Sequence, residues 1–195
     1  MKRTGKLFFT ALLLVLSIYV GSSFTVDDNL YSSEELIREI GTDEIIFAVR
    51  EDGNDHIWGH WYANFGYYCL DPSYKNYGKE GRLCRYNVAT GELSILVNDP
   101  QGTVRDPQVH YSGEKIIFSW RKAGSEHFHL YEINIDGTHL RQLTNGPFSD
   151  IEPIYLPDGG IIFVSSRCKR WVNCWQVPVA NIHRCDGDGG NIRQL

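Results

Sequence analysis

A short apolar stretch decides the fold, because the chain contains it twice. Residues 115–120 read KIIFSW, and residues 160–165 read GIIFVS, 45 positions further along the chain. An acidic residue followed by proline precedes each stretch, Asp106-Pro107 in the first copy and Glu152-Pro153 in the second, at an offset of 46. Matching strands and matching acid–proline pairs at nearly one spacing indicate an internal repeat, which is the signature of stacked structural units.

The repeat continues into the hairpin that follows each strand. Residues 130–143 read LYEINIDGTHLRQL and return as residues 181–195, NIHRCDGDGGNIRQL, where the offset has grown to 52. A weaker, earlier copy consists of residues 44–50, EIIFAVR, and residues 83–96, LCRYNVATGELSIL, separated by an insert at 56–81. The chain therefore holds two clear copies of one unit and a third, more divergent copy.

Each unit has the pattern of four short antiparallel strands. The runs Ile116-Ile117 and Ile161-Ile162 are typical of a strand that is buried on both faces. Asp136-Gly137 supplies the positive φ of a tight hairpin turn. A period of about 45 residues with four strands and no helix favours a β-propeller, whose blades must stack to bury their faces. We predict an all-β fold in which residues 44–195 form a partial β-propeller of four-stranded antiparallel blades.

Composition and charge agree with this fold and narrow the classes of partner that we expect. Eleven tyrosines, nine phenylalanines and five tryptophans among 195 residues favour β-structure. The formal net charge is -5, from 19 basic and 24 acidic residues, and the basic residues form no cluster that could neutralise a phosphate backbone. We therefore expect a protein partner or a small ligand rather than nucleic acid, and we expect no cofactor.

Residues 1–23 have the pattern of a secretory signal peptide. Three basic residues precede an apolar run at 7–20, and small residues follow it at 21–23. The apolar run is shorter than the roughly 20 residues that a bilayer crossing needs. An uncleaved membrane anchor is the alternative, and it would be the chain's one contact with a membrane. We expect a periplasmic or secreted protein whose remaining chain is more acidic still.

A short helix is predicted between this leader and the first blade, within residues 24–43. Ser32 and Glu35 have the spacing of a capping box, and Gly41 follows the last apolar position as a C-terminal cap. The apolar residues between them lie on one stripe, at Leu36, Ile37 and Ile40.

Five cysteines follow the predicted leader, and in an exported protein they are candidates for disulfides. Cys69 and Cys84 flank a polar stretch that a bridge would hold, and Cys168 and Cys174 flank five residues. Either of the latter two could instead meet Cys185, and an odd number leaves at least one thiol without a partner in the chain. The spacings lack the paired Cys-x-x-Cys of zinc sites, so we predict no metal here.

These motifs resemble TolB-type β-propeller repeats, in which an Asp-Pro pair, a Pro-Asp-Gly turn, an Ile-Phe strand and a hairpin ending in Arg-Gln-Leu-Thr recur. Residues 60–69 (HWYANFGYYC), Arg105–Pro107 and residues 167–175 (RCKRWVNCW) further resemble exported bacterial propellers similar to the middle domain of the hydrazine synthase alpha subunit. The resemblance covers about residues 44–195 and implies a six-bladed propeller. The family's chemistry belongs to haem-bearing Cys-x-x-Cys-His segments, which this chain lacks, so no catalytic residue is carried over.

The six blades that the resemblance implies need more residues than the chain has. Six blades of about 45 residues need about 270 residues, and residues 193–195 stop where the first copy continues with TNGP at 144–147. We therefore expect the chain to be the N-terminal part of a longer protein.

Arg105, Asp106 and Glu152 are candidate site residues, because the two acids recur at equivalent places before a proline. In TolB-type repeats such acids lie near the start of the inner strand of a blade. The resemblance implies that they hold neighbouring loops by hydrogen bonds or line the central channel. Arg105 can form an internal ion pair with Asp106 or contact an anion.

The insert holds the second candidate, an aromatic binding surface. Large rings stack well on sugars, on haem edges or on partner proteins. A plug that covers the edge of the propeller is the structural alternative for this segment. The candidate residues are Trp58, Trp61, Tyr62, Phe65, Tyr67 and Tyr68.

Other polar pairs give weaker signals. His56 with His60 and His127 with His129 have spacings that a metal could use, but a zinc site needs a third ligand, so we predict no metal. No Gly-x-Ser-x-Gly elbow supports a Ser-His-Asp triad, although the sequence leaves a triad open. Residues 186–191, DGDGGN, resemble part of a calcium loop, but a hairpin turn fits them better.

Taken together, the sequence favours an exported, non-catalytic β-propeller module that binds or scaffolds a protein or ligand in the cell envelope. The alternative is the propeller domain of a larger periplasmic enzyme, an oxidoreductase of the hydrazine synthase type or a hydrolase, whose catalytic residues would lie beyond Leu195.

Overall fold

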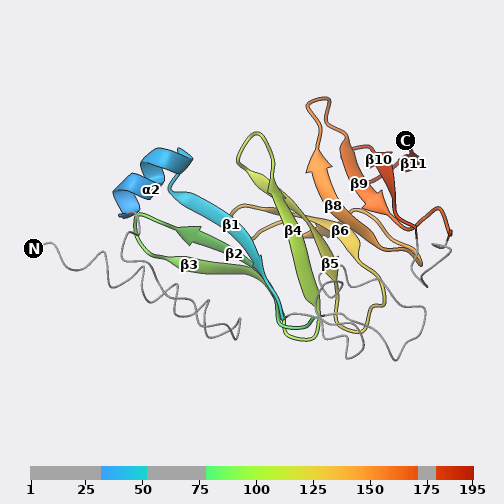
Figure 1. The fold of residues 1–195 in the computed structure, drawn as a ribbon, viewed down its shortest axis with the longest axis horizontal. Helices are drawn as coiled ribbons and strands as arrows, with labels where there is room; N and C mark the ends of the chain where they lie inside the picture. Colours follow the sequence, from blue (N-terminus) through green and yellow to red (C-terminus); the bar gives the residue numbers. More distant parts are fainter. Residues whose placement is uncertain (1–31, 52–77, 171–178) are drawn as a thin grey trace, which may run out of the picture. The chain divides into compact units, whose positions relative to one another are not determined.

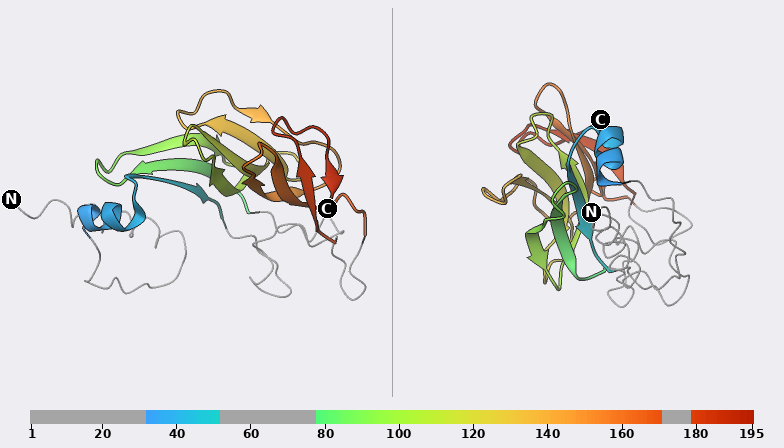
Figure 2. Two further views of the ribbon diagram at one scale, coloured as in Figure 1. Left: turned by 90° about the horizontal axis from the view of Figure 1, so that it is seen from above. Right: turned by 90° about the vertical axis from the view of Figure 1, so that its left-hand side faces the viewer.

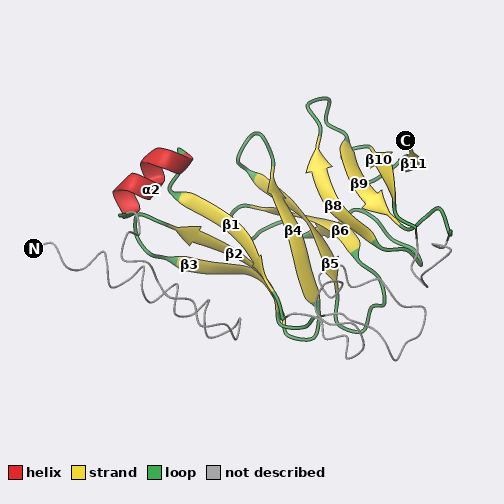
Figure 3. Cartoon of the chain, viewed as in Figure 1, coloured by secondary structure: helices red, strands yellow, loops and turns green. Residues whose placement is uncertain are grey.

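The computed structural model describes residues 32–51, 78–170 and 179–195. These residues form one short helix, α2, and eleven strands in three sheets, which we name sheets A, B and C (Figures 1 and 3). The predicted all-β fold with a short N-terminal helix is therefore confirmed. The predicted signal peptide, the aromatic surface at 58–68, Cys69 and Cys174 lie outside the described residues.

The chain divides into two compact units, Met1–Ile45 with Arg85–Ser94, and Ile46–Cys84 with Ile95–Leu195. The first contains α2 (Ser33–Ile40), whose capping box is formed as predicted: Ser32 Oγ accepts from the Glu35 backbone, and Glu35 accepts from the Ser32 backbone. Gly41 closes the helix at a φ of 73°, which a residue with a side chain seldom adopts. Helix α2 is thus defined by local hydrogen bonds at both ends.

Sheet A has three strands in the order β1-β2-β3. Its strands are β1 (Glu44–Val49), β2 (Gly81–Asn87) and β3 (Leu93–Asp99). They match the weaker copy of the repeat, with β1 in the EIIFAVR stretch and β2 and β3 in the predicted hairpin. Within the first unit, the Val88 N–H donates to the Asp43 carbonyl oxygen over 2.7 Å and the Asn87 N–H to that of Glu92 over 2.9 Å.

Sheet B is a four-stranded antiparallel meander in the second unit. Its strands are β4 (Thr103–Val109), β5 (Lys115–Arg121), β6 (His129–Asn134) and β7 (Arg141–Gln142). Strand β5 is buried on both faces, as predicted, since Ile116 and Ile117 are both 0% exposed. The predicted turn follows β6, where Gly137 has a φ of 86° and the Asn134 N–H donates to the Thr138 carbonyl oxygen.

Sheet C repeats this topology. Its strands are β8 (Asp150–Tyr155), β9 (Ile161–Ser165), β10 (Asn181–Cys185) and β11 (Arg193–Gln194). Residues 186–191 form a hairpin turn, in which the Asp186 N–H donates to the Gly190 carbonyl oxygen over 2.9 Å. Two such sheets confirm the four-stranded blades that the repeat predicts.

The registers of sheets B and C show which residues are equivalent. In sheet B, Ile117 on β5 lies opposite Gln108 on β4 and Glu132 on β6. In sheet C, Ile162 on β9 lies opposite Ile154 on β8 and Arg184 on β10. Ile162 therefore corresponds to Ile117, and Arg184 to Glu132.

Sheets B and C pack face to face, and the further views of Figure 2 keep them adjacent. A buried cluster joins them, made of Ile117, Leu130 and Leu143 from the sheet B repeat and Tyr155, Ile161, Phe163 and Cys185 from sheet C. The opposite face of sheet B contributes to a second cluster, which contains Leu83, Val97, Val104, Ile116, Phe118, Trp120, Tyr131 and Ile133. Because side chains alternate along a strand, one face of sheet B covers sheet C and the other covers part of β2 and β3.

The first strand of each blade carries a bulge at the acid–proline pair. The register shifts between Arg105 and Gln108 in β4 and between Ile151 and Ile154 in β8. Asp106 and Glu152 lie inside these shifts with φ values of 54° and 55°. A bulge adds one residue to one strand, re-aims its side chain and bends the strand. The recurring acids therefore mark the place where the first strand of each blade bends.

Candidate functional site

The two bulges come together through the residues that the sequence singled out. Arg105 Nε donates to Asp106 Oδ2 over 2.6 Å, and Arg105 Nη2 lies 3.5 Å from Glu152 Oε1. The Glu152 backbone N–H also donates to Asp106 Oδ2, over 3.1 Å. We name Arg105, Asp106 and Glu152 the bulge triad. It links the first strand of sheet B to the first strand of sheet C.

The bulge triad combines a buried cation with accessible anions. The Arg105 side chain is 6% exposed and lies 5.8 Å from the centre of the Phe128 ring, whereas the carboxylates of Asp106 and Glu152 are 20% and 46% exposed. A buried guanidinium needs paired charges, and these carboxylates provide them. Their exposed oxygens remain able to accept hydrogen bonds from a ligand.

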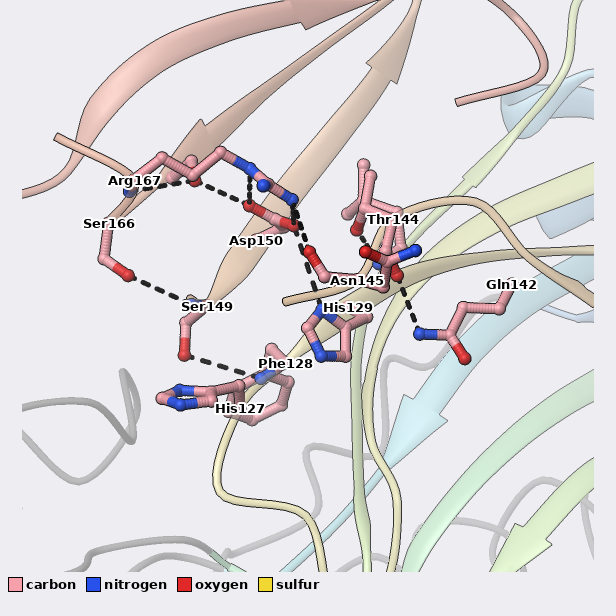
Figure 4. Close-up of polar contacts among 12 residues, drawn as sticks. His127, Phe128, His129, Gln142, Thr144, Asn145, Ser149, Asp150, Ser166 and Arg167 are labelled. Carbon is pink, nitrogen blue, oxygen red and sulfur yellow. Dashed lines mark hydrogen bonds and ion pairs between the residues drawn. The ribbon is translucent and has the colours of Figure 1, made fainter. Parts of the chain in front are cut away.

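A second polar cluster surrounds Asp150, at the start of β8 (Figure 4). The Asp150 side chain is 0% exposed, and Arg167 binds it in a two-point contact, with Nε 3.2 Å from Oδ1 and Nη2 2.7 Å from Oδ2. The Ser165 hydroxyl donates to Oδ1 over 2.6 Å. His129 Nδ1 of sheet B lies 3.9 Å from Oδ2, so this cluster also spans the joint between the two sheets.

The Asp150 cluster keeps its carboxylate ionised. Burial raises the pKa of Asp150, but His129, Ser165 and Arg167, which face the carboxylate, together hold that pKa below its usual value. Arg167 Nη2 also donates to the Asn145 carbonyl oxygen over 3.0 Å, and its guanidinium lies 4.9 Å from the centre of the Phe148 ring. Since each of these contacts fixes a loop at the strand ends, the cluster is suited to holding structure.

A third cluster centres on Glu132 in β6, which is 6% exposed. Arg141 donates to Glu132 Oε1 through Nε at 3.0 Å and Nη2 at 2.6 Å, and Lys115 Nζ lies 2.9 Å from Oε2. The Tyr155 hydroxyl of sheet C donates to Oε2 over 2.9 Å, and Arg141 Nη2 reaches the Gly187 carbonyl oxygen over 3.2 Å. These contacts cross from sheet B to sheet C.

The Glu132 cluster keeps its carboxylate ionised and its tyrosine protonated. Burial raises the pKa of Glu132, but hydrogen bonds from Lys115, Arg141 and Tyr155 outweigh it and hold that pKa below its usual value. Burial, together with the Glu132 charge, raises the pKa of the Tyr155 hydroxyl far above its ordinary value. Tyr155 therefore stays protonated and acts only as a donor here.

The structure describes part of the predicted cysteine set. The described cysteines Cys84, Cys168 and Cys185 form no disulfide with one another. Burial raises the pKa of Cys84 and also, with help from Asp150, that of Cys185 to about 11. The Cys168 thiol donates to the Val179 carbonyl oxygen over 3.1 Å. Bridges from Cys84 to Cys69 and from Cys168 to Cys174 stay predictions, because Cys69 and Cys174 lie outside the described residues.

Sequence reasoning found the bulge triad but missed the clusters around Asp150 and Glu132. The acid–proline recurrence identified Asp106 and Glu152 because both copies keep it. Glu132 and Asp150 lack such a signal, since the corresponding positions in the other copy hold Arg184 and Val104. The Arg-Gln-Leu motif at 141–143, which recurs at 193–195, was a usable signal for a cation at the end of the two clear copies.

The described residues contain neither a metal-binding cluster nor a helix that could span a membrane. No group of three His, Cys, Asp or Glu side chains in 32–51, 78–170 or 179–195 is arranged to hold a metal ion. Helix α2, the helix found in those ranges, is too short and too polar to cross a membrane.

Comparison with known proteins supports the propeller. No protein-family model matches the sequence. Over 94 residues, 47% of this chain, the sequence is 35% identical to hydrazine synthase subunit alpha of Kuenenia stuttgartiensis and covers 12% of that protein. The solved hydrazine synthase of the same organism matches with a TM-score of 0.51 and 22% identity, over 73% of this chain and 21% of that one. A putative TolB from Agrobacterium tumefaciens gives a TM-score of 0.48 and 19% identity, over 59% of this chain and 40% of that one.

The chain has a TolB-like β-propeller fold. Its similarity to hydrazine synthase subunit alpha confirms the resemblance that the repeat motifs predicted. The TolB-like chain spans about an eighth of that curated relative, so the likeness concerns the propeller module and not the relative as a whole.

Proposed function

We propose that this TolB-like chain is an exported propeller module that binds a protein or a small ligand in the cell envelope and catalyses no reaction itself. The observation that carries the proposal is the bulge triad. It presents two partly exposed carboxylates from neighbouring blades on a rigid support, because buried Arg105 holds both of them. A fixed pair of hydrogen-bond acceptors is suited to recognition of a partner with donor groups.

The charged clusters in the joint support a scaffold role. The carboxylates of Glu132 and Asp150 are each surrounded by cationic and hydroxyl donors of the same chain. Both clusters connect elements of sheets B and C, and their hydrogen bonds fix the geometry of the joint. Rigid positioning of a recognition surface is what a binding module needs, because it lowers the entropy lost on association.

Export is supported by residues 1–23, with their basic start, apolar run and small-residue exit. The test is fractionation of the native cell combined with N-terminal sequencing of the purified protein. We expect the protein in the envelope fraction with a new N-terminus after about residue 23. A cytoplasmic protein that still begins at Met1 would contradict export.

Binding is tested with the natural protein, affinity-tagged and isolated from envelope extracts. We expect a partner or ligand to be retained in about a 1:1 ratio, and Glu152→Gln with Asp106→Asn to lower its recovery by about fivefold. Glu114→Gln, at another exposed acid, is the matched control and should leave recovery unchanged. Equal recovery from all three proteins would refute a role for the bulge triad.

The similarity to hydrazine synthase subunit alpha favours a second candidate, the propeller domain of a larger periplasmic enzyme. The purified natural protein distinguishes the two candidates. A haem absorption band, or a stoichiometric metal detected by elemental analysis, would favour the enzyme and overturn the non-catalytic proposal. A colourless, metal-free protein that retains a partner would favour the binding module.

A further inference from the structure

Asn145 and Gly146 form a pair whose side-chain amide and backbone N–H the proposed function does not use. They lie in the loop between β7 and β8, which connects sheet B to sheet C, and both are exposed. The sequence contains no other Asn-Gly pair. Four other described asparagines precede a β-branched residue: Asn87, Asn134, Asn181 and Asn191. A β-branched side chain crowds its own backbone nitrogen, whereas glycine leaves that nitrogen open. Asn145 is therefore the described asparagine that precedes the least crowded nitrogen.

The reacting groups of this pair are not engaged elsewhere in the described residues. The Gly146 N–H has no hydrogen-bond acceptor there, and the Asn145 side-chain amide has no hydrogen-bond partner there. The Asp-Gly turns differ, because the N–H groups of Gly137, Gly159 and Gly189 each donate to a backbone carbonyl oxygen over 2.9 to 3.0 Å. A hydrogen-bonded nitrogen must give up that bond before it reacts. Gly146 therefore offers the more available nitrogen.

The loop geometry requires glycine at position 146. The φ of Gly146 is 108°, and a Cβ atom there would lie 3.1 Å from the Phe148 ring. Both ends of the loop are held, since the Leu143 N–H donates to a backbone carbonyl oxygen of β6 over 2.8 Å and the Asp150 N–H to one just before β6 over 2.9 Å. The Asn-Gly pair is thus built into the connection between the two sheets.

Arg167 contacts the backbone carbonyl of the same asparagine (Figure 4). Its Nη2 donates to the Asn145 carbonyl oxygen over 3.0 Å, while Asp150 holds the same guanidinium through Nε and Nη2. The Arg167 side chain is 18% exposed, so the cation is largely shielded from water. A donor held at a carbonyl oxygen stabilises the negative charge that develops there when a nucleophile adds to the carbonyl carbon.

We propose that Asn145-Gly146 is a self-modification site, at which Asn145 loses its amide nitrogen and becomes isoaspartate. The Gly146 nitrogen adds to the side-chain carbonyl carbon of Asn145, and the new C–N bond replaces the bond to the amide nitrogen. That nitrogen leaves as ammonia, taking the proton of the Gly146 N–H, and a five-membered imide remains. Water then opens the imide, so the conversion needs no oxidant or reductant. Neighbouring groups in one chain react as an intramolecular pair, which favours the first step.

Arg167 directs the second step. Water that attacks the former backbone carbonyl breaks its bond to the Gly146 nitrogen and gives isoaspartate, whereas attack on the side-chain carbonyl gives aspartate. Because Arg167 donates to the backbone carbonyl oxygen, isoaspartate is favoured, and its new α-carboxylate forms beside the guanidinium. A neutral amide has then become an anion next to the cation that holds Asp150. The modification therefore acts on the joint between sheets B and C.

The test follows the purified natural protein during incubation at mildly alkaline pH, where the backbone nitrogen loses its proton more readily. We expect an acidic form to accumulate on isoelectric focusing, and the peptide that contains residue 145 to gain about 1 Da. Asn145 should be modified about tenfold faster than Asn191, an exposed asparagine that precedes isoleucine. Asn145→Gln should abolish the acidic form and Asn191→Gln, the matched control, should leave it unchanged. Circular dichroism checks that both variants fold.

The ratio of the two products tests the role of Arg167. Fragmentation of the modified peptide in a mass spectrometer distinguishes isoaspartate from aspartate. We expect the ratio of isoaspartate to aspartate to be about threefold higher in the folded protein than in protein unfolded in urea, where Arg167 no longer contacts Asn145. Two results would overturn the proposal: modification of Asn145 no faster than that of Asn191, or an equal product ratio in the folded and unfolded protein.

Discussion

Sheets B and C share one backbone pattern but use different chemistry at corresponding places. Opposite Ile117, β6 carries Glu132, which collects Lys115, Arg141 and the Tyr155 hydroxyl. Opposite Ile162, β10 carries Arg184, which faces Arg193 across the hairpin. The bulges, registers and turns repeat while the charges do not. Repetition therefore preserves how a blade is built, whereas the polar residues at corresponding positions differ between the two blades.

The largest expected effect comes from the Asp150 cluster. We expect Asp150→Ala to lower the free energy of unfolding by about 3–5 kcal/mol, because it leaves the partly buried Arg167 guanidinium without its carboxylate. Urea denaturation followed by circular dichroism measures this change. Asp158→Ala removes the exposed partner of Arg184 in sheet C and should change stability far less. Equal losses from the two variants would contradict a dominant role for the buried cluster.

The second prediction compares Ile117, on the face of sheet B that sheet C covers, with Ile162, on the face of sheet C that points away from sheet B. Ile117→Ala should lower the free energy of unfolding by about 2–5 kcal/mol, because it opens a cavity under sheet C. Ile162→Ala removes the same atoms at the equivalent position and should cost less than about 1.5 kcal/mol. Denaturant midpoints of the isolated chain report both values. Similar losses of unfolding free energy from the two variants would mean that Ile162 is as well covered as Ile117.

Much of this comparison could be predicted from the sequence, and the reasons are local. Strand β5, helix α2 and the turn at Gly137 follow from runs of neighbouring residues, and the equivalence of Asp106 and Glu152 follows from their prolines. The joint itself could not be predicted. The contact between Tyr155 and Glu132 depends on how two sheets pack, and a single buried acid such as Asp150 leaves no periodic signal.

A smaller effect is expected where Tyr155 crosses the joint. Tyr155→Phe removes one donor from Glu132 and keeps the ring, so we expect a loss of about 1 kcal/mol. Tyr111→Phe is the matched control, since the Tyr111 hydroxyl donates to the Tyr155 carbonyl oxygen from a side chain that is 70% exposed. Thermal unfolding compares the two variants. A greater loss for Tyr111→Phe would place the important hydroxyl outside the joint.

The smallest expected effect is the pH dependence of the free energy of unfolding. The pKa values of Asp150 and Glu132 are held below their usual values in the folded chain. The stability they contribute is fully present above the ordinary carboxyl pKa of about 4 and is lost as pH falls through the lower, folded values. We expect the free energy of unfolding to fall below about pH 4, by at most about 1.4 kcal/mol per pH unit for each group. Glu132→Gln should flatten this slope, and an unchanged slope would contradict the assignment.

The acid–proline bulges limit how another chain can pair with the edges of sheets B and C. Strands β4 and β8 each lie at an edge of their sheet, where exposed backbone groups would otherwise pair with any extended chain. Pro107 and Pro153 have no N–H to offer, and the bulge beside each interrupts the even spacing that an added strand would need. These edges are thus protected against strand addition and against the edge-to-edge aggregation that it starts. At these two edges a partner must contact the blades through side chains.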